Sequence, residues 1–364
     1  MQTKIGIIGG SGVYDIDGLE NRDWVTVETP WGIPSDDLLT GTLDGIDMVF
    51  LPRHGRGHVQ TPSTVNYRAN IAALKMLGVT DVFSVSACGS FREDMAPGDF
   101  VIVDQFIDRT FAREKSFFGP GLVAHVSVAH PTCSRLMDAA EAAARATGTT
   151  VHRGGTYLAM EGPQFSSMAE SHLYRQWGCD VIGMTNMPEA KLAREAELCY
   201  ASIAMITDYD SWHPDHGAVE ISDIIRTLHG NSAKARETVA GLPAQLGPDR
   251  APCPCGCDTA LEFAIMTAPE KRDPLMVERL RTIAARVLEP EAPVSSDVSK
   301  TFRKNLAKIL DRTEVWNAGS LAEACGLGKS AIYDILYGRS KAPRLDTVAK
   351  IANTLGVKIT DLLE

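Results

Sequence analysis

The sequence predicts a mixed α/β domain followed by a small all-helical domain, and three observations lead to this prediction. Short, continuous apolar runs alternate with stretches of helical periodicity through most of the chain, as in a sheet that is covered on both faces. Residues 289–296 then bring two prolines and small polar residues without periodicity, which indicates a linker. The residues after it are few, basic and helical in pattern. We expect a first domain at 1–288, a linker at 289–297 and a second domain at 298–364.

The apolar runs and the periodic stretches predict the elements of the first domain. Strands are expected at 4–8, 48–51, 81–85, 101–103, 181–182 and 201–206. Helices are expected at 66–77, 188–198 and 221–240. In the first of these helices, Ala69, Ala72, Ala73 and Leu77 recur on one face, which is the spacing of a helix packed on a sheet.

Length and composition exclude several classes of protein. The chain has 364 residues, enough for two domains, and its 44% hydrophobic and 23% charged residues are an ordinary globular balance. It contains no run of about 18 apolar residues, so no membrane span is expected. The N-terminus enters a strand pattern without the features of a secretory signal, so we expect a cytoplasmic protein.

The net charge of -10 is unevenly distributed along the chain. Residues 298–364 contain 11 Lys and Arg against 7 Asp and Glu, a balance of +4, whereas residues 1–297 contain 25 against 39, a balance of -14. The acidic part is therefore a poor candidate for binding nucleic acid through its general field, but the basic part has the required sign.

Three of the eight cysteines, Cys253, Cys255 and Cys257, form one run. A plain turn of reduced thiols is the favoured interpretation, ahead of a labile disulfide and of zinc. Zinc sites usually have two residues between paired cysteines and need a second cluster, and neither feature is visible in the sequence. We therefore predict no metal site.

Three segments that follow predicted strands have the composition of phosphate-binding loops. Residues 9–12 are three glycines and a serine, residues 52–58 contain arginines and histidines, and residues 84–90 contain serines and small residues. Backbone amides, hydroxyls and cationic side chains of this kind can surround an anion. None is a Walker motif, and the first lacks the complete fingerprint of a dinucleotide site, so NAD is not expected.

Three further segments make the pattern specific: Met-Glu-Gly-Pro-Gln-Phe-Ser-Ser at 160–167, Gly-Met-Thr-Asn-Met-Pro-Glu at 183–189 and Thr-Asp-Tyr-Asp at 207–210. In this order they resemble the nucleoside phosphorylase superfamily, and within it the trimeric purine nucleoside and S-methyl-5'-thioadenosine phosphorylases. The resemblance runs from the first strand to about residue 240. It implies the nucleoside phosphorylase fold, a homotrimer or hexamer, and phosphate and a purine nucleoside as substrates, with no cofactor.

The resemblance also implies roles for individual residues. The phosphate site would comprise Ser11, Arg53, His54, Ser86, Ala87 and Thr185. Met184 would lie under the ribose, Phe165 would stack on the base, and the loop of Asp208, Tyr209 and Asp210 would read the base. Ser166 and Ile221 would tune specificity. His125 would reach the 5' pocket of a neighbouring subunit, with His130 as the alternative. Gly183 departs from the family, in which many members carry Asn.

The chemistry of phosphorolysis suits this set of residues. Phosphate attacks C1' of an oxocarbenium-like transition state while the purine leaves, so a positioned anion stabilises the developing cation. The leaving purine needs a proton at N7, and a buried carboxylic acid with a raised pKa can donate it. Asp208 is the candidate for this catalytic role.

The same residue bears on the choice of purine. A carboxylate accepts a hydrogen bond from a 6-amino group and repels a 6-oxo group, and the resembling 6-oxopurine enzymes carry Asn at this position. We therefore expect phosphorolysis of S-methyl-5'-thioadenosine to adenine and 5-methylthioribose 1-phosphate, a step of purine and methionine salvage. The alternative within the family is a 6-oxopurine nucleoside or methylthioinosine phosphorylase. The alternative of another class is a nucleoside-sensing, DNA-binding transcription regulator.

The basic second domain has the pattern of a helix-turn-helix. Helices are expected at 301–310, on either side of Gly326 within 320–336, at 345–355 and from residue 360, with Leu321, Ala322, Ile332 and Leu336 in the shared core. This segment resembles the Cro and lambda-repressor class. The resemblance implies a recognition helix at 328–336, whose Lys329, Ser330 and Tyr333 would face the groove of duplex DNA while Arg339 contacts phosphate. The alternative is a helical interaction module without DNA function.

Overall fold

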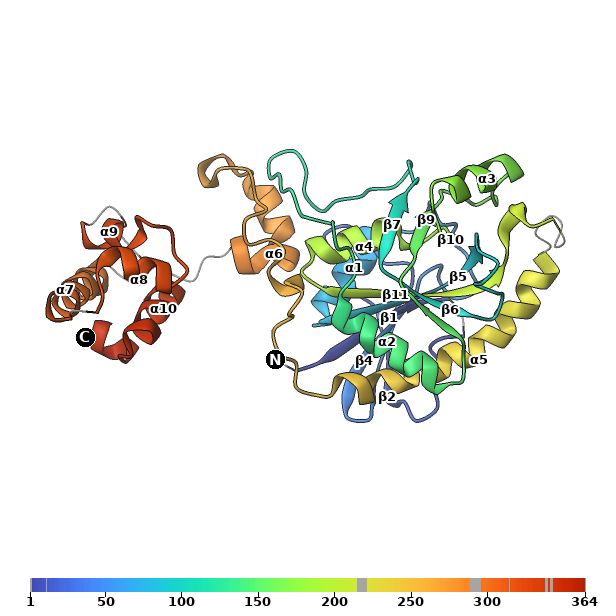
Figure 1. Ribbon diagram of the computed structural model, residues 1–364, viewed down its shortest axis with the longest axis horizontal. Coiled ribbons are helices and arrows are strands. Elements are labelled where there is room, and N and C mark those ends of the chain that lie inside the picture. The colour runs from blue at the N-terminus through green and yellow to red at the C-terminus, as the bar shows by residue number, and fades with distance from the viewer. Residues whose placement is uncertain are drawn as a thin grey trace. The chain divides into compact units, whose positions relative to one another are not determined.

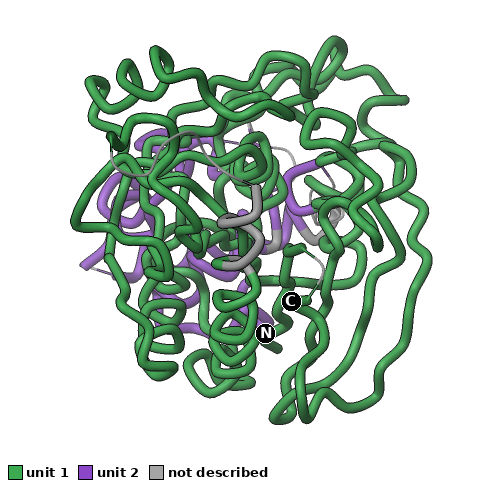
Figure 2. The backbone as a smooth tube through the Cα atoms, turned by 90° about the vertical axis from the view of Figure 1, so that its right-hand side faces the viewer, with its two compact units in different colours: residues 1–285 green, residues 286–364 purple. Residues whose placement is uncertain are grey.

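The computed structural model describes residues 2–10, 12–214, 221–288, 296–313, 315–337, 340 and 343–363. The side chains at 221–226, 228, 296–298 and 345 are outside this description. The chain divides into two compact units, residues 1–285 and residues 286–364 (Figure 2). Each unit is described below by itself.

Unit 1 is built on a mixed sheet whose centre consists of parallel strands. β1 (Lys4–Gly9) lies between β4 (Ile46–Pro52) and β5 (Asp81–Ser90), and it is parallel to both. The other side of β5 pairs in parallel with β11 (Cys199–Asp208). Beyond β4, the antiparallel strands β3 (Leu38–Leu43) and β2 (Glu20–Val25) complete one edge. The predicted strands of this region are therefore confirmed, and β5 continues through the serine-rich segment to residue 90.

The sheet divides at the end of β5. The last residues of β5 pair with β10 (Val181–Gly183), which leads to β9 (Thr156–Ala159) and β7 (Gln105–Asp108). Residues 202–205 of β11 instead pair with β6 (Phe100–Val103), which in turn pairs with β8 (Val151–Arg153). Because the two branches separate there, the carboxyl ends of β5 and β11 face an open space rather than a continuous sheet.

Helices cover both faces of the sheet, as the apolar strands predict. α2 (Ser134–Ala146) and α5 (Ile221–Leu246) run side by side over one face (Figure 1) and enclose a core that includes Phe83, Val85 and Ile203. α1 (Tyr67–Met76) and α4 (Asn186–Glu195) belong to the opposite face, where Tyr200 of β11 contacts Glu189 of α4. In the chain, α3 (Met168–Gln176) lies between β9 and β10, and α6 (Pro274–Leu288) follows α5.

Local sequence explains where these helices begin. The Asn66 side chain accepts a hydrogen bond from the amide of Ala69 and caps α1, which is the role of a short polar side chain at a helix N-terminus. Ser167 and Glu170 form a reciprocal capping box at the start of α3. This cap fixes the end of the 160–167 segment that the sequence singles out.

Unit 2 consists of five short helices in its described part. They are α7 (Ser296–Arg312), α8 (Ala318–Ala324), α9 (Ala331–Leu336), α10 (Leu345–Leu355) and α11 (Ile359–Leu363). Leu321, Ala322 and Ile332 are buried in the shared core as predicted, but Ile335 takes the fully buried place expected of Leu336, which is only partly buried. Leu336 still packs against this core, because the third and the fourth positions after Ile332 lie on the same face of a helix. No described helix of either unit is long and apolar enough to cross a membrane.

Candidate active site

A cavity of about 570 Å³ opens where the two branches of the sheet separate. Its wall includes residues from the ends of β4, β5, β10 and β11 and from the 160–167 segment. The predicted site residues that line it are Arg53, His54, Ser86, Ala87, Phe165, Met184, Thr185, Asp208 and Asp210. Segments that are far apart in the sequence thus meet around one space large enough for a small ligand.

The remaining predicted residues of unit 1 are placed elsewhere or are not described. Ser166 is buried behind the wall, with its hydroxyl 3.8 Å from the sulfur of Met160. Tyr209 points away and donates to the carbonyl of Glu93 at 3.3 Å, and His125 is exposed on a loop. Ser11 and the side chain of Ile221 lie outside the described residues.

The guanidinium of Arg53 is held rigidly at the floor of the cavity. It is buried and forms an ion pair with Glu189, at 2.9 Å from Nε to Oε1 and 3.3 Å from Nη2 to Oε2. Nη2 also donates to the hydroxyl of Ser84 at 2.6 Å, and Nη1 donates to the carbonyl of Val85 at 3.1 Å. Burial alone would lower the pKa of Arg53, but the charge of Glu189 and the hydrogen bond to it, with smaller contributions from Tyr200 and Tyr67, together raise it above its ordinary value. Arg53 therefore keeps its charge in the cavity.

Glu189 belongs to a buried polar chain that reaches the hydroxyl of Ser86. Ser86 donates to the side-chain oxygen of Asn186 at 3.0 Å, and the amide of Asn186 donates to Tyr200 at 3.1 Å. Tyr200 in turn donates to Glu189 at 3.0 Å. Asn186 and Glu189 stand in the 183–189 segment, but the sequence assigned them no role. Their partners are more than ten residues away, so no local spacing indicates this network.

His54 is a neutral imidazole in this environment. Its Nδ1 lies 2.9 Å from the carbonyl oxygen of Gln60, so Nδ1 carries the proton and Nε2 is an acceptor. Burial and the neighbouring charge of Arg53 lower the pKa of His54 to about 4. The ring stacks on His58 with 4.3 Å between the ring centroids. Near neutral pH, His54 therefore presents a hydrogen-bond acceptor rather than a second cation.

Asp208 ends β11 at a shift in its pairing with β5. One carboxylate oxygen accepts from Thr207 Oγ1 at 2.7 Å, and the other accepts from the amide of Asp210 at 2.8 Å. Burial raises the pKa of Asp208 above its ordinary value, although these two hydrogen bonds oppose the shift. A Cβ atom on Gly89 would lie 3.0 Å from Oδ1, so the glycine leaves the space in which this carboxyl group lies.

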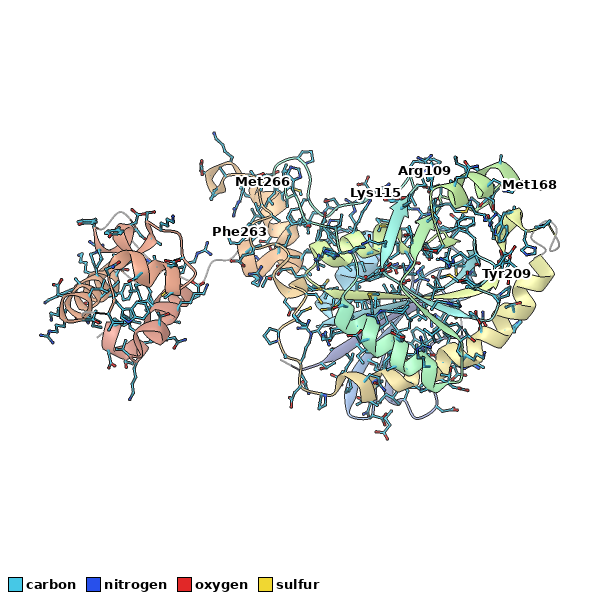
Figure 3. All side chains as sticks on the ribbon, viewed as in Figure 1. Arg109, Lys115, Met168, Tyr209, Phe263 and Met266 are labelled. Atoms are coloured by element: carbon cyan, nitrogen blue, oxygen red, sulfur yellow. The ribbon has the colours of Figure 1, made fainter. Side chains whose placement is uncertain are left out.

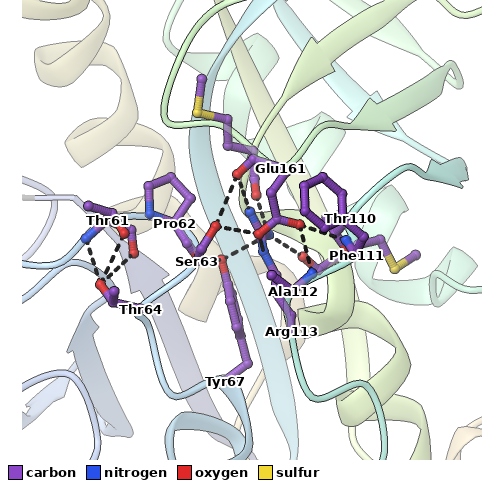
Figure 4. Close-up of polar contacts among 12 residues, drawn as sticks. Thr61, Pro62, Ser63, Thr64, Tyr67, Thr110, Phe111, Ala112, Arg113 and Glu161 are labelled. Carbon is purple, nitrogen blue, oxygen red and sulfur yellow. Dashed lines mark hydrogen bonds and ion pairs between the residues drawn. The ribbon is translucent and has the colours of Figure 1, made fainter.

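Arg113 and Glu161 form a second network of polar contacts (Figure 4). Arg113 donates through Nη1 to the carbonyls of Met184 at 2.5 Å and Met187 at 2.7 Å, and it forms an ion pair with Glu161. Glu161 also accepts from the amide of Phe111 at 2.6 Å. Glu161 stands in the motif at 160–167, but nothing near Arg113 in the sequence indicates its role. The pair sets the position of the cavity wall at Met184 and Thr185.

The side chain of Tyr157 explains why residue 183 is a glycine, where many members of the family carry Asn. A Cβ atom at residue 183 would lie 1.8 Å from the hydroxyl of Tyr157 and 2.6 Å from the ring carbon that bears it. Tyr157 is fully buried on β9, the strand that pairs with β10. The tyrosine hydroxyl thus fills the space that a side chain at 183 would need, and the two residues are coupled.

Comparison with known proteins places the chain in a family. Residues 4–242 match the phosphorylase superfamily, and the chain belongs to it. Among its relatives is the S-methyl-5'-thioadenosine phosphorylase of Cereibacter sphaeroides, 71% identical over 289 residues, which are 79% of this chain and all of the relative. The enzyme of the same name from Rhodospirillum rubrum is 61% identical over 287 residues, 79% of this chain and 98% of the relative.

Solved structures agree with this placement. A methylthioadenosine phosphorylase from an antarctic soil metagenomic library is 46% identical, with a TM-score of 0.73 over 77% of this chain and 98% of that chain. A Schistosoma mansoni methylthioadenosine phosphorylase in complex with adenine is 38% identical, with a TM-score of 0.65. The match covers 68% of this chain and 93% of that chain. Separately, residues 305–364 match the Cro/C1-type HTH DNA-binding domain. The predicted fold of both parts is confirmed.

The contact between Gly183 and Tyr157 predicts a coupled effect on stability. We expect Gly183→Ala to lower the free energy of unfolding by about 1–3 kcal/mol, because the new methyl group overpacks a filled space. In a Tyr157→Leu background the same substitution should cost clearly less, because the obstructing ring is gone. Denaturant unfolding of the four proteins measures the coupling.

Gly119→Ala is the matched control, since a Cβ atom there meets nothing within 4 Å. An equal cost of Gly183→Ala in both backgrounds would contradict the steric explanation.

Proposed function

We propose that unit 1 catalyses the phosphorolysis of S-methyl-5'-thioadenosine to adenine and 5-methylthioribose 1-phosphate. The observation that carries the proposal is the meeting of a buried cation, Arg53, and a partly buried acid with a raised pKa, Asp208, on one cavity wall. Phosphorolysis needs an anchored anion on one side of C1' and a proton donor for the leaving base on the other. The names and high identities of the relatives support the same substrate. The products suit purine and methionine salvage.

Phosphate would bind at the end of the cavity that Arg53, Ser86 and Thr185 line. One Nη1 hydrogen of Arg53 has no acceptor among the described residues, so it is available to a phosphate oxygen. Neutral His54 would accept the proton of a monobasic phosphate through Nε2. The family resemblance adds Ser11 and the backbone of Ala87. The bound anion would then stabilise the oxocarbenium character of the ribose, which Met184 supports from below.

The purine would bind beside Asp208 and Phe165. Asp208 would donate a proton toward N7 of the leaving adenine and, with Asp210, favour a 6-amino group. Burial also raises the pKa of Asp210, so two acids in the cavity are protonated more readily than usual. Phe165 is 49% exposed at the cavity edge, a suitable place for an aromatic ring that stacks on a base. By the family resemblance, Ser166 and Ile221 would tune specificity, and Tyr209 would belong to the loop that reads the base.

We propose a homotrimer, or a hexamer of two such trimers, in which His125 approaches a neighbouring subunit. His125 is exposed, and Val123, Phe263 and Met266 are exposed apolar side chains of the same part of the chain (Figure 3). The amide of His125 donates to the carbonyl of Ala264 at 2.8 Å, so the two segments form one surface. Exposed apolar side chains that gather in this way favour a subunit contact.

We propose that unit 2 binds duplex DNA through α9 as a separate domain. Lys329 and Ser330 are exposed directly before α9, and Tyr333 is 44% exposed on it. Tyr337, which the sequence did not single out, is 72% exposed and stacks on Tyr333. A cation directly before this helix and two tyrosines, one within it and one at its C-terminal end, suit a groove contact. Arg339 lies outside the described residues.

The first test of catalysis changes the proton donor. We expect Asp208→Asn to lower kcat/KM for S-methyl-5'-thioadenosine by about 10²- to 10⁴-fold, because an amide cannot donate the proton that a carboxylic acid supplies. Activity toward methylthioinosine should fall much less, because an amide can donate to the 6-oxo group. The ratio of the two kcat/KM values is the measurement, and misfolded protein does not change it. An unchanged ratio in favour of the 6-aminopurine would contradict the assignment, and a wild type that prefers methylthioinosine would support the alternative substrate.

The second test separates phosphate binding from nucleoside binding. Thr185→Ala should raise the KM for phosphate at least about tenfold while changing the KM for the nucleoside little, because a charge-assisted hydrogen bond is worth more than 1 kcal/mol. Thr207→Ala makes the same chemical change on the Asp208 side of the cavity and serves as the control. If both variants shift the two KM values alike, the phosphate does not bind at Thr185.

The third test concerns unit 2. Truncation after residue 288 should leave kcat/KM within about twofold, because separately folded units share few contacts. The full chain should retain duplex DNA in a gel shift at low salt, with affinity that falls as salt rises. Lys329→Glu should weaken this binding more than Lys358→Glu, which changes the same charge at an exposed position outside α9. Equal effects of the two variants, or no binding at low salt, would favour the helical interaction module.

A further inference from the structure

Four buried cysteines from three distant parts of unit 1 meet at one point. Cys133 directly precedes α2, Cys199 begins β11, and Cys253 and Cys257 come from the segment after α5. Their four sulfur atoms all lie within 4.8 Å of one another. All four are free thiols.

This cluster corrects the expectation of a plain turn at 253–257. The pair that meets is Cys253 and Cys257, which have three residues between them, a spacing found in zinc sites. The second pair, Cys133 and Cys199, is not a sequence cluster at all. The fold brings it together, because β11 starts beside the residue that begins α2: the amide of Cys133 donates to the carbonyl of Tyr200 at 2.8 Å.

The sulfur positions suit tetrahedral coordination. A Zn–S bond of about 2.3 Å places the four sulfurs of a tetrahedral site about 3.8 Å apart. The sulfurs of Cys133 and Cys253 are 3.6 Å apart, close to this sulfur–sulfur distance. They are far beyond the bond length of about 2.05 Å in a disulfide.

Cationic groups around the cluster suit thiolates rather than neutral thiols. Arg250 Nη2 donates to the sulfur of Cys199 at 3.2 Å, and Arg194 Nη1 donates to the sulfur of Cys257 at 3.2 Å. Zn²⁺ with four thiolates has a net charge of -2, and buried charge needs partners of opposite sign. The two guanidinium groups would supply them, in the way that outer hydrogen bonds orient and stabilise metal ligands.

We propose that Cys133, Cys199, Cys253 and Cys257 bind one Zn²⁺ ion in a closed, structural site. Four protein ligands leave no open position for substrate or water, so the ion has no part in phosphorolysis. Its place in the fold agrees, because Cys199 and Asp208 are the two ends of β11, roughly 30 Å apart at about 3.3 Å a residue.

The ion would fasten the segment after α5 to the sheet. Beyond Cys257 this segment reaches residues 264–266, where the carbonyl of Ala264 accepts from His125 and the amide of Met266 donates to the carbonyl of Val123, both at 2.8 Å. The surface that carries His125 therefore rests on a segment that the four cysteines hold. Loss of the ion would therefore loosen this segment and the surface around His125 first, and would affect the cavity less.

The test begins with the full chain, purified under reducing conditions without chelator. Elemental analysis should find about one zinc per subunit, and a mercurial reagent should release it to a chromogenic chelator. Removal of the metal should lower Tm by at least about 5 °C, and Zn²⁺ but not Mg²⁺ should restore it, because only the folded chain offers the complete ligand set.

Substitutions then assign the ligands. Cys257→Ser and Cys133→Ser should each lower the zinc content at least about tenfold. Cys325→Ser, in unit 2, is the control for replacing a buried cysteine and should keep it. Cys255 lies 3.8 Å from Cys133 but is only half-buried, and Cys255→Ser should also keep the zinc.

Three results would overturn the proposal. A wild-type chain that neither contains zinc nor takes it up when reduced has no such site, and this measurement does not depend on any variant. Stoichiometric iron in place of zinc would refute the choice of metal. A disulfide among the four cysteines, detected by mass spectrometry after alkylation of the native protein, would refute coordination.

Discussion

The buried ion pair between Arg53 and Glu189 is the interaction on which the cavity depends. It joins the end of β4 to α4, and through the other donors of Arg53 it holds β1 and β5 as well. Removing one partner of such a pair typically costs about 3–5 kcal/mol, because the other charge stays buried and uncompensated. The pair therefore contributes both to stability and to the charge of the cavity, because Glu189 holds the guanidinium of Arg53 in place and favours its ionised form.

The alternation of side chains along β5 and β11 explains how such a polar floor exists inside an α/β core. Phe83, Val85 and Ile203 point toward α2 and α5, and the residues between them point the other way. That second face carries Ser84, Tyr200 and Ser202, all buried. Buried polar groups are tolerated only when they are hydrogen-bonded. The chain of Ser86, Asn186, Tyr200 and Glu189 meets that requirement and makes the orientation of each donor depend on the next.

The central strands and the motifs around the cavity could be predicted because their signals are local. Apolar runs mark β1, β4, β5 and β11, and parallel strands bring their ends, including Arg53 and Asp208, to one edge of the sheet. Contacts between distant positions leave no such signal. The Arg113–Glu161 pair spans 48 residues, and the cysteines meet only after β11 and the segment after α5 are in place. The sequence predicts β10 at 181–182, but β8 and β9, of three and four residues, are too short to show alternation.

β11 runs from the cysteine cluster of unit 1 to the cavity. It begins at Cys199, among the sulfurs that hold the segment after α5, and it ends at Asp208, beside the proposed base. A catalytic group must be held within a fraction of an ångström, and strands inside a sheet achieve this better than loops. Pairing with β5 and β6 on its two sides gives β11 that rigidity. The segment that bears on the proposed subunit surface is instead a long loop, and one isolated bridge joins its Ile265 to Ala124. Side chains therefore have a larger part in positioning it, namely the ion pairs of Arg250 with Asp81 and Asp258 and the four cysteines.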